Sequence, residues 1–185
     1  MPATNNAPFS SSEWTFLSRL LAMVAEQFAY KSSTDFALEA SDEHKAIVAA
    51  AIERAGVSGN WGDDNATGED CVAQVMDEDA QIVTFMDWMA EHLAARCATR
   101  AAGAAAPASG AELALMAELL DVAREDHDDA EGLGLVPHAI DMTGDNRAVL
   151  ASISSEDTRP PGQETRVPFK AALIFFGERC AAASS

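Results

Sequence analysis

The longest uninterrupted helical pattern in this sequence, from Glu69 to Ala101, constrains the fold more than any other feature. Neither proline nor glycine interrupts it. Apolar side chains recur along it at spacings of three, four and seven residues, which would place them on one face of a helix. These apolar positions are Val72, Val75, Met76, Ile82, Met86, Met89, Leu93 and Cys97. At about 1.5 Å per residue such a helix would span a small domain, so we predict a central helix with shorter helices packed on its apolar face.

The acidic run from Asp77 to Asp79 leaves an alternative open within this segment. Acidic residues of this kind are common at the first positions of helices. The segment would then form two consecutive helices instead of one.

Capping boxes mark the starts of two other helices. Ser10 with Glu13, and Ser109 with Glu112, form the pattern S-x-x-E ahead of an apolar run. In this pattern each side chain can bond the backbone N–H of the other residue. We therefore predict a first helix from Ser10 to about residue 30, and a fourth helix after Ser109.

Capping and breaking residues mark the remaining elements. Ser41 or Asp42 can cap a second helix that ends near Gly56, and Pro168 suits the first turn of a last helix. Residues 147–153 fit either a short helix or a short β element. Together these patterns predict an all-α protein, an irregular helical bundle of about five to six helices around the long central one.

Length and composition favour a single folded unit. The chain has 185 residues, of which 48% are apolar, and this is enough for one hydrophobic core. A low-complexity, alanine-rich segment at residues 98–110 separates an acidic N-terminal helical part, 10–101, from a C-terminal helical part, 109–185. We expect the two parts to pack as one globular unit, and residues 1–9 to form a flexible tail.

The formal net charge of −18 is the most unusual property of the composition. No lysine or arginine occurs between residues 55 and 95, so the predicted central helix and the loop before it carry unbalanced negative charge. Nucleic acids and anionic membranes bind cationic surfaces. The charge therefore argues against direct binding to nucleic acid or to a membrane, and it favours a basic protein or a ribonucleoprotein as the partner.

The sequence carries no signal for export or for membrane insertion. Its first residues lack the basic and apolar regions of a secretory signal, and no apolar run approaches the roughly 18 residues that span a bilayer. Cys71, Cys97 and Cys180 are widely spaced and form no C-x-x-C pair, which is typical of reduced thiols. We expect a cytoplasmic protein.

Carboxylates spaced along a rigid helix can imitate nucleic-acid phosphates and occupy the basic channel of a nucleic-acid-binding protein. Small acidic inhibitors of phages and mobile elements, including some anti-CRISPR proteins, work in this way, and we expect a function of this class. Trp61 and Trp88 would anchor the interface, although Trp88 fits a wide core face equally well. Exposed aromatics and a long helix are also compatible with a homodimer. The carboxylates predicted to bind the partner are Asp63, Asp64, Glu69, Asp70, Asp77, Glu78, Asp79, Asp126, Asp128 and Asp129.

One loop resembles the calcium-binding loop of EF-hand proteins. Asp63, Asn65 and Thr67 occupy the first, third and fifth ligand positions of that loop. The twelfth position, which supplies a bidentate glutamate in the family, holds Gln74. We therefore predict an acidic loop that caps the following helix, without a metal ion.

The dipeptide His127-Asp128 resembles the HD signature of all-helical, metal-dependent phosphohydrolases. The resemblance implies a further histidine upstream and an aspartate downstream around a metal pair, and His92 with either Asp141 or Asp157 would have to supply them. That family carries the dipeptide on a buried, apolar helix. Here it lies in a run of charged residues, which is typical of a solvated helix end.

No other catalytic motif is present in the sequence. It lacks a G-x-S-x-G nucleophile pattern, a phosphate-binding glycine loop and an H-E-x-x-H metal motif. We therefore predict no catalytic residues, no cofactor and no metal site. The alternative functions are a metal-dependent all-α phosphohydrolase and an acidic helical domain whose charge serves only solubility.

Overall fold

The computed structural model describes residues 8–29, 34–37, 42–55, 76–77, 82–85, 87–134, 139–142 and 165–185. Most of these residues are helical, and the all-α class predicted from the sequence is confirmed, with short strands added between the helices. None of the helices described is long and apolar enough to cross a membrane. In chain order the elements are α1 (Ser11–Phe28), β1 (Thr34–Ala37), α2 (Asp42–Ala55), β2 (Met76–Asp77), β3 (Ile82–Phe85), α4 (Asp87–Ala101), α5 (Gly110–Glu125), α6 (His127–Gly132), β4 (Ala139–Met142), β5 (Thr165–Pro168) and α8 (Phe169–Ser184).

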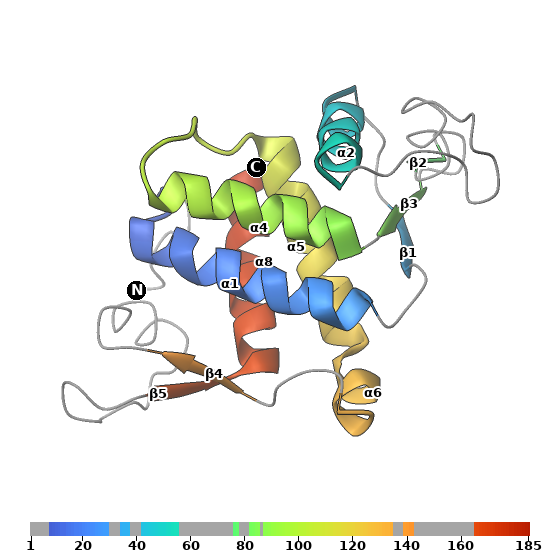
Figure 1. Cartoon of the computed structure of the whole chain (residues 1–185), viewed down its shortest axis with the longest axis vertical. Helices are drawn as coiled ribbons and strands as arrows, with labels where there is room; N and C mark the ends of the chain where they lie inside the picture. Colours follow the sequence, from blue (N-terminus) through green and yellow to red (C-terminus); the bar gives the residue numbers. More distant parts are fainter. Residues whose placement is uncertain are drawn as a thin grey trace.

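Two antiparallel helix pairs form the body of the molecule. In the first pair α1 packs along α4, where the Ser11 hydroxyl donates to the Ala101 carbonyl oxygen at 2.6 Å. About two turns further along α1, the Ser18 hydroxyl donates to the Ala94 carbonyl oxygen at 2.7 Å. Since a later residue of α1 meets an earlier residue of α4, the two helices run in opposite directions. Figure 1 shows this pair crossed by the second pair, α5 and α8, with α2 beside α4 and α6 at the end of α5.

The second pair is closely packed at a glycine. Gly110, the first residue of α5, faces Ser184 at the end of α8, which shows that these helices are also antiparallel. A Cβ atom at Gly110 would lie only 2.9 Å from the Ser184 carbonyl oxygen. Any side chain at this position would push the two helix ends apart, so the close approach requires glycine.

The hydrophobic core lies between the two helix pairs. On α1, the side chains of Leu17, Leu21 and Val24 are fully buried, as their three- and four-residue spacing predicts. Phe16 of α1 stacks on Phe176 of α8 with ring centroids 5.0 Å apart, which joins the two layers. Burying a side chain of this size contributes roughly 1.5–3 kcal/mol. Apolar residues at helical spacing on α5 and α8 are also buried, namely Leu113, Met116, Leu119, Leu120, Ala123, Phe169, Ala172, Leu173 and Phe176.

The predicted central helix over residues 69–101 is wrong at the residues described before Asp87, namely 76–77 and 82–85, which are strands. The helix α4 begins only at Asp87, and the residues described before it form β2 and β3. Strand β3 pairs antiparallel with both β1 and β2 in a sheet of order β1-β3-β2. The run Ile82–Phe85 consists of β-branched and aromatic residues, which favour strands. At the start of α4 the Trp88 backbone N–H donates to the Asp87 carboxylate at 2.9 Å.

The alternative break at Asp77–Asp79 is correct only in part. Asp77 ends the strand β2, so it does not lie inside a helix, and the residues described next, 82–85, form the strand β3 ahead of α4. Strands also lie between the predicted helices: β1 lies between α1 and α2, and β4 pairs antiparallel with β5 ahead of α8. Pairing with a distant segment supplies the backbone hydrogen bonds here, and a local sequence pattern does not display that pairing.

Several predicted boundaries fall at the limits of the described residues. The linker expected at 98–110 begins only at residue 102, because α4 continues to Ala101. Residues 147–153 lie outside the described part of the chain, as does most of the predicted tail. The last residue of that tail, Phe9, stacks on Trp14 of α1 with ring centroids 4.5 Å apart.

Candidate partner-binding surface

Most of the carboxylates predicted to bind a partner lie outside the described residues. For Asp77 the structure describes the backbone alone, as the second residue of β2. The three acids at the α5–α6 junction and Trp88 are described in full. The predicted partner-binding residues outside the described residues are Trp61, Asp63, Asp64, Glu69, Asp70, Glu78 and Asp79.

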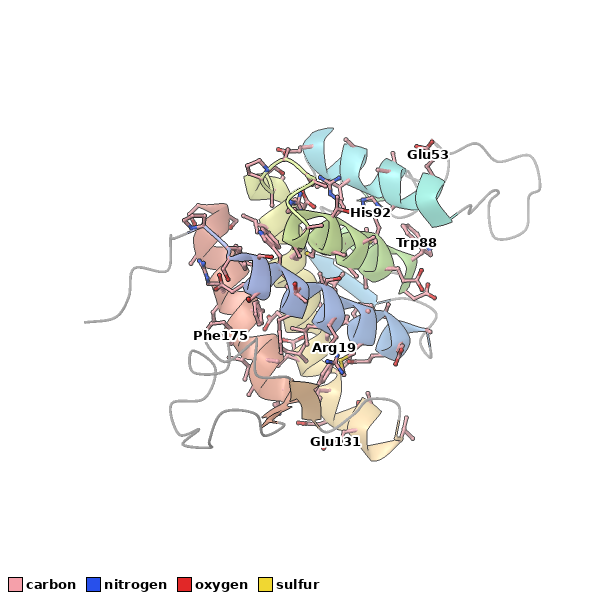
Figure 2. The ribbon with its side chains drawn as sticks, turned by 60° about the vertical axis from the view of Figure 1, so that its left-hand side comes forward. Arg19, Glu53, Trp88, His92, Glu131 and Phe175 are labelled. Carbon is pink, nitrogen blue, oxygen red and sulfur yellow. The ribbon has the colours of Figure 1, made fainter. Side chains whose placement is uncertain are left out.

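Trp88 is not available as an interface anchor. Its side chain belongs to the hydrophobic core, and only 8% of its surface is exposed. The ring lies on the first turn of α4 (Figure 2), where a partner could reach it only if the core opened. Trp88 therefore takes the core position that its spacing also allowed, with little of its ring accessible to a partner.

Among the predicted acids at the α5–α6 junction, Asp128 already forms an ion pair with Lys170. The Lys170 ammonium donates to both of its carboxylate oxygens, at 3.0 and 3.2 Å. Hydrogen bonds from Lys170, and then from His127, lower the pKa of Asp128 below its usual value. Asp129 is exposed, and Asp126 is half-buried. Of the three carboxylates predicted here, Asp129 is thus the most accessible to a cationic partner.

The histidine of the His127-Asp128 pair is buried, which corrects the expectation of a solvated helix end. The His127 ring packs against Phe169 of α8, with ring centroids 5.7 Å apart. Its Nδ1 atom lies 3.3 Å from Asp128 Oδ1 and 3.6 Å from Glu131 Oε2. Figure 2 marks Glu131 on α6, one helical turn beyond the histidine.

These three side chains could hold a metal ion, since one ligand atom from each lies within 4.8 Å of the others. Two features weigh against such a site. Lys170 occupies the Asp128 carboxylate, and a metal ion would have to displace it. His92, the upstream histidine that the phosphohydrolase resemblance requires, is not part of this cluster.

A buried ion pair joins the two helix pairs. Arg100 of α4 donates to both carboxylate oxygens of Glu112 on α5, at 2.9 and 2.6 Å. Arg96 donates to the same two oxygens, at 2.6 and 3.2 Å. Burial alone would raise the pKa of Glu112, but the hydrogen bonds from both arginines outweigh it, and the pKa is lowered. Because the Glu112 carboxylate accepts hydrogen bonds from the arginines, only half of the capping box at Ser109 forms. The Glu112 backbone N–H donates to the serine hydroxyl.

Acidic side chains hold other cations of the described helices in the same way. Arg179 of α8 donates to Glu13 of α1 at 3.3 Å. Arg124 donates to Asp121 within α5 at 2.6 Å. With Arg96, Arg100 and Lys170, five cations are therefore held in ion pairs within the protein. Beyond these pairs the described residues carry further exposed acids, such as Glu91, Asp129 and Glu178.

A row of carboxylates on α5 was missed by the sequence analysis. Glu118, Asp121 and Glu125 are spaced by three and four residues, so they lie along one face of the helix. Burial, and then the neighbouring charges of Asp121 and Glu125, raise the pKa of Glu118. The spacing was visible in the sequence, but the segment was considered only for its apolar face.

This row borders a groove between α5 and α8, with a volume of about 410 Å³. Ile174 lies in the groove with 41% of its surface exposed, which is unusual for a large apolar residue in this protein. Acidic side chains from both helices stand beside an apolar floor. We call this feature the α5–α8 groove, and it is lined by Ala117, Glu118, Asp121, Arg124, Leu173, Ile174, Gly177, Glu178 and Ala181.

A larger cavity of about 490 Å³ lies near the start of α1 and is mostly apolar. Trp14 and Phe9 form part of its wall, and the Arg100 guanidinium lies 5.2 Å from the centre of the Trp14 ring. Arg100 already bonds Glu112 and the Ala106 carbonyl oxygen. These contacts make its charge part of the structure.

No family model, no curated protein and no solved structure matches this chain. Function therefore has to be inferred from its own residues and their geometry. The described residues bring together two candidates: the acidic α5–α8 groove and the cluster around His127.

Proposed function

We propose that this protein is an acidic inhibitor that binds the cationic surface of a nucleic-acid-binding protein or ribonucleoprotein in place of nucleic acid. The observation that carries the proposal is the excess of exposed acids over exposed cations among the described residues, where Glu91, Asp129 and Glu178 are exposed and the cations of α5 and α8 are held in ion pairs. The net charge of −18 then acts outward. Opposite fields on two proteins accelerate their association and make it sensitive to salt.

The ordered acids of the α5–α8 groove support the proposal more directly than the long acidic helix predicted from the sequence. Helix α4 lacks the first half of that predicted segment, and Asp128 is paired with Lys170. On α5, Glu118 and Glu125 stand in one row with Asp121, which pairs with Arg124, on a helix whose opposite face is buried in the core. A rigid scaffold of this kind can present charges at fixed spacing. Phages and mobile genetic elements use inhibitors of this class, and an anti-CRISPR role is one form that the function would take.

A competition measurement tests this function. A labelled DNA duplex is bound to a basic, sequence-independent DNA-binding protein, and the purified chain is added while fluorescence anisotropy is followed. We expect the chain to displace the duplex at about 50 mM salt and to lose at least tenfold in effect at about 200 mM, because counterions screen the contacts. Failure to displace the duplex at a large molar excess at low salt would contradict the proposal.

The same assay tests the surface first predicted from the sequence. Charge reversal at Asp77, Glu78 and Asp79 to lysine should weaken displacement if these acids contact the partner. Displacement that is unchanged by this reversal would remove residues 77–79 from the surface. It would leave the acids of the groove, Asp129 and the predicted acids between residues 63 and 70 as candidates.

A metal-dependent phosphohydrolase is the second candidate, favoured by the cluster of His127, Asp128 and Glu131. Two of these residues, His127 and Glu131, are one helical turn apart, a spacing that allows both to bind one ion. The test is titration of the protein with Zn²⁺ or Mn²⁺ by calorimetry, followed by hydrolysis of a nitrophenyl phosphate. Hydrolysis that requires the metal and is lost in His127→Asn would support this function, and absence of both binding and hydrolysis would eliminate it.

A further inference from the structure

Building on the proposed function, we infer that the α5–α8 groove is the docking site for an amphipathic, cationic helix of the partner protein. The groove combines an exposed apolar residue with acidic side chains on both of its sides. Ile174 and Glu178 come from α8, whereas Glu118 and Asp121 come from α5. A ligand that fits must therefore be apolar along its centre and basic along both flanks.

The floor of the groove suits the approach of another helix. Ala117 on α5, together with Gly177 and Ala181 on α8, lines it with the smallest side chains. Ridges of side chains on one helix pack into grooves of this kind on another. Because Ile174 is 41% exposed beside this floor, an apolar side chain of the partner would find a contact that water now covers.

Charge complementarity selects a cationic helix over an apolar one. Arg124 neutralises Asp121 within the groove, whereas no cation of the described residues pairs with Glu118 or Glu178, which stand on opposite sides. An uncharged apolar helix would remove these carboxylates from water without a compensating charge, which is unfavourable. Lysine or arginine on each flank would supply that charge. Glu118 in particular lies near two other acids, and a cation placed there would relieve the repulsion among them.

The experiment uses a designed helical peptide of leucine and lysine, about 18 residues long, with leucine along one face and lysine on both sides of it. Its binding to the full chain is measured by anisotropy at low salt. Ile174→Ser, and separately the double variant Glu118→Gln/Glu178→Gln, should each weaken binding by about tenfold. A matched peptide of leucine and glutamate should not bind.

Two control variants change the same residue types away from the groove. Leu133→Ser removes the other exposed large apolar residue of the described chain, which is 75% exposed. Glu43→Gln/Glu53→Gln removes two exposed acids of α2 and so matches the change in net charge. Both controls should bind the peptide within about twofold of the parent protein, because neither Leu133 nor the two glutamates of α2 line the groove. Circular dichroism checks that every variant is folded.

The outcomes distinguish failure of the docking site from failure of the proposed function. Equal weakening by the groove variants and the α2 variant would mean that only total charge matters, and this would overturn the docking site. If the parent protein displaces DNA in the competition assay and the groove variants displace it equally well, the docking site is wrong while the proposed function stands. If the parent protein displaces nothing and also fails to bind the leucine–lysine peptide, both are wrong.

Discussion

At the scale of single residues, Glu112 is the side chain whose charge the fold most depends on. It is 2% exposed and is the shared acceptor of Arg96 and Arg100. Glu112→Gln would leave the buried Arg100 guanidinium without a counter-charge, so we expect a loss of about 3 kcal/mol in the free energy of unfolding. Urea denaturation followed by circular dichroism measures this loss. Because the pKa of Glu112 is lowered on folding, its contribution is present above about pH 4.5 and is lost as the pH falls.

A matched substitution separates the effect of this charge from that of any glutamate on the same helices. Glu91→Gln changes an exposed glutamate of α4 and should alter the free energy of unfolding by no more than about 0.5 kcal/mol. If Glu112→Gln proved as mild as Glu91→Gln, the ion pair would contribute little, and the apolar contacts between the helix pairs would have to hold them together.

Glu118 should respond to pH in the opposite sense. Its pKa is raised by burial and by the charges of Asp121 and Glu125, so the folded state binds the proton more readily than the unfolded state. Glu118→Gln should therefore stabilise the protein at pH 7, by about 0.5 kcal/mol or less because solvent screens the site. The gain should vanish below the ordinary value of 4.5. Urea denaturation at pH 7 and at about pH 4 measures it.

Asp128→Asn is the control with the opposite sign. Lys170 lowers the pKa of Asp128, so this variant should lose stability at pH 7, and the loss should disappear as the pH falls below 3.8. The two variants remove one negative charge each. A pH response of the same sign in both would show that total charge, and not the local contacts of Glu118, determines the effect.

At the scale of elements, the start of α1 depends on a complete capping box. The Glu13 backbone N–H donates to the Ser10 hydroxyl at 3.2 Å, and the Ser10 backbone N–H donates to the Glu13 carboxylate at 2.7 Å. Ser10→Ala should therefore lower the free energy of unfolding by about 1 kcal/mol. Ser10→Asp keeps an acceptor at the cap and should restore most of the loss in urea denaturation. If both variants were equally destabilised, the hydroxyl would have a role other than capping.

Local signals allowed the helices with strong caps to be predicted from the sequence. The first helix and the helix after Ser109 begin where their capping boxes place them, and α2 ends within one residue of Gly56. The last helix begins directly after Pro168. These starts and ends depend on nearby residues alone, which is why a single sequence reveals them.

The segment before α4 was mispredicted because its structure depends on a distant partner. The apolar spacing between residues 69 and 86 suits a helix, but Ile82–Phe85 pairs with Thr34–Ala37 in the antiparallel register of β1 and β3. That pairing supplies the backbone hydrogen bonds of the segment. The strand-favouring residues of β3 are visible in the sequence, whereas no local pattern identifies Thr34–Ala37 as its partner.

The candidate surface was harder to predict than the fold because it combines two distant elements. Glu178 of α8 lies about sixty positions from Glu118 and Asp121 of α5 in sequence, and they meet only once the helices pack. The sequence displayed the negative charge as a total. Which acids the internal cations neutralise, as Lys170 does for Asp128, became evident only from the packed structure.

At the scale of the whole molecule, the negative charge has two opposing effects, on partner binding and on folding stability. Carboxylates that would attract a cationic partner also repel one another, and folding brings them closer together than they are in the unfolded chain. The internal ion pairs reduce this repulsion where α4 meets α5 and where α1 meets α8. The charge that remains on the surface should therefore destabilise the free protein at low ionic strength and make binding of a cationic partner more favourable.

Salt should consequently raise the thermal stability of the free protein while it weakens the binding. Between about 10 and 100 mM NaCl the screening length falls from about 30 to about 10 Å. Repulsion among the surface acids falls with it, and we expect about 1 kcal/mol of added stability, or roughly 2–4 °C in Tm for a chain of this size. Calorimetry in NaCl and in Na₂SO₄ at equal ionic strength distinguishes screening from surface exclusion, because screening depends on ionic strength, whereas sulfate is also excluded from protein surfaces. Equal rises in the two salts would identify repulsion as the cause; a Tm that stayed level in NaCl and rose only in sulfate would mean that the surplus acids are too far apart to repel. Acids so widely spaced could not present the dense field that competition with nucleic acid requires.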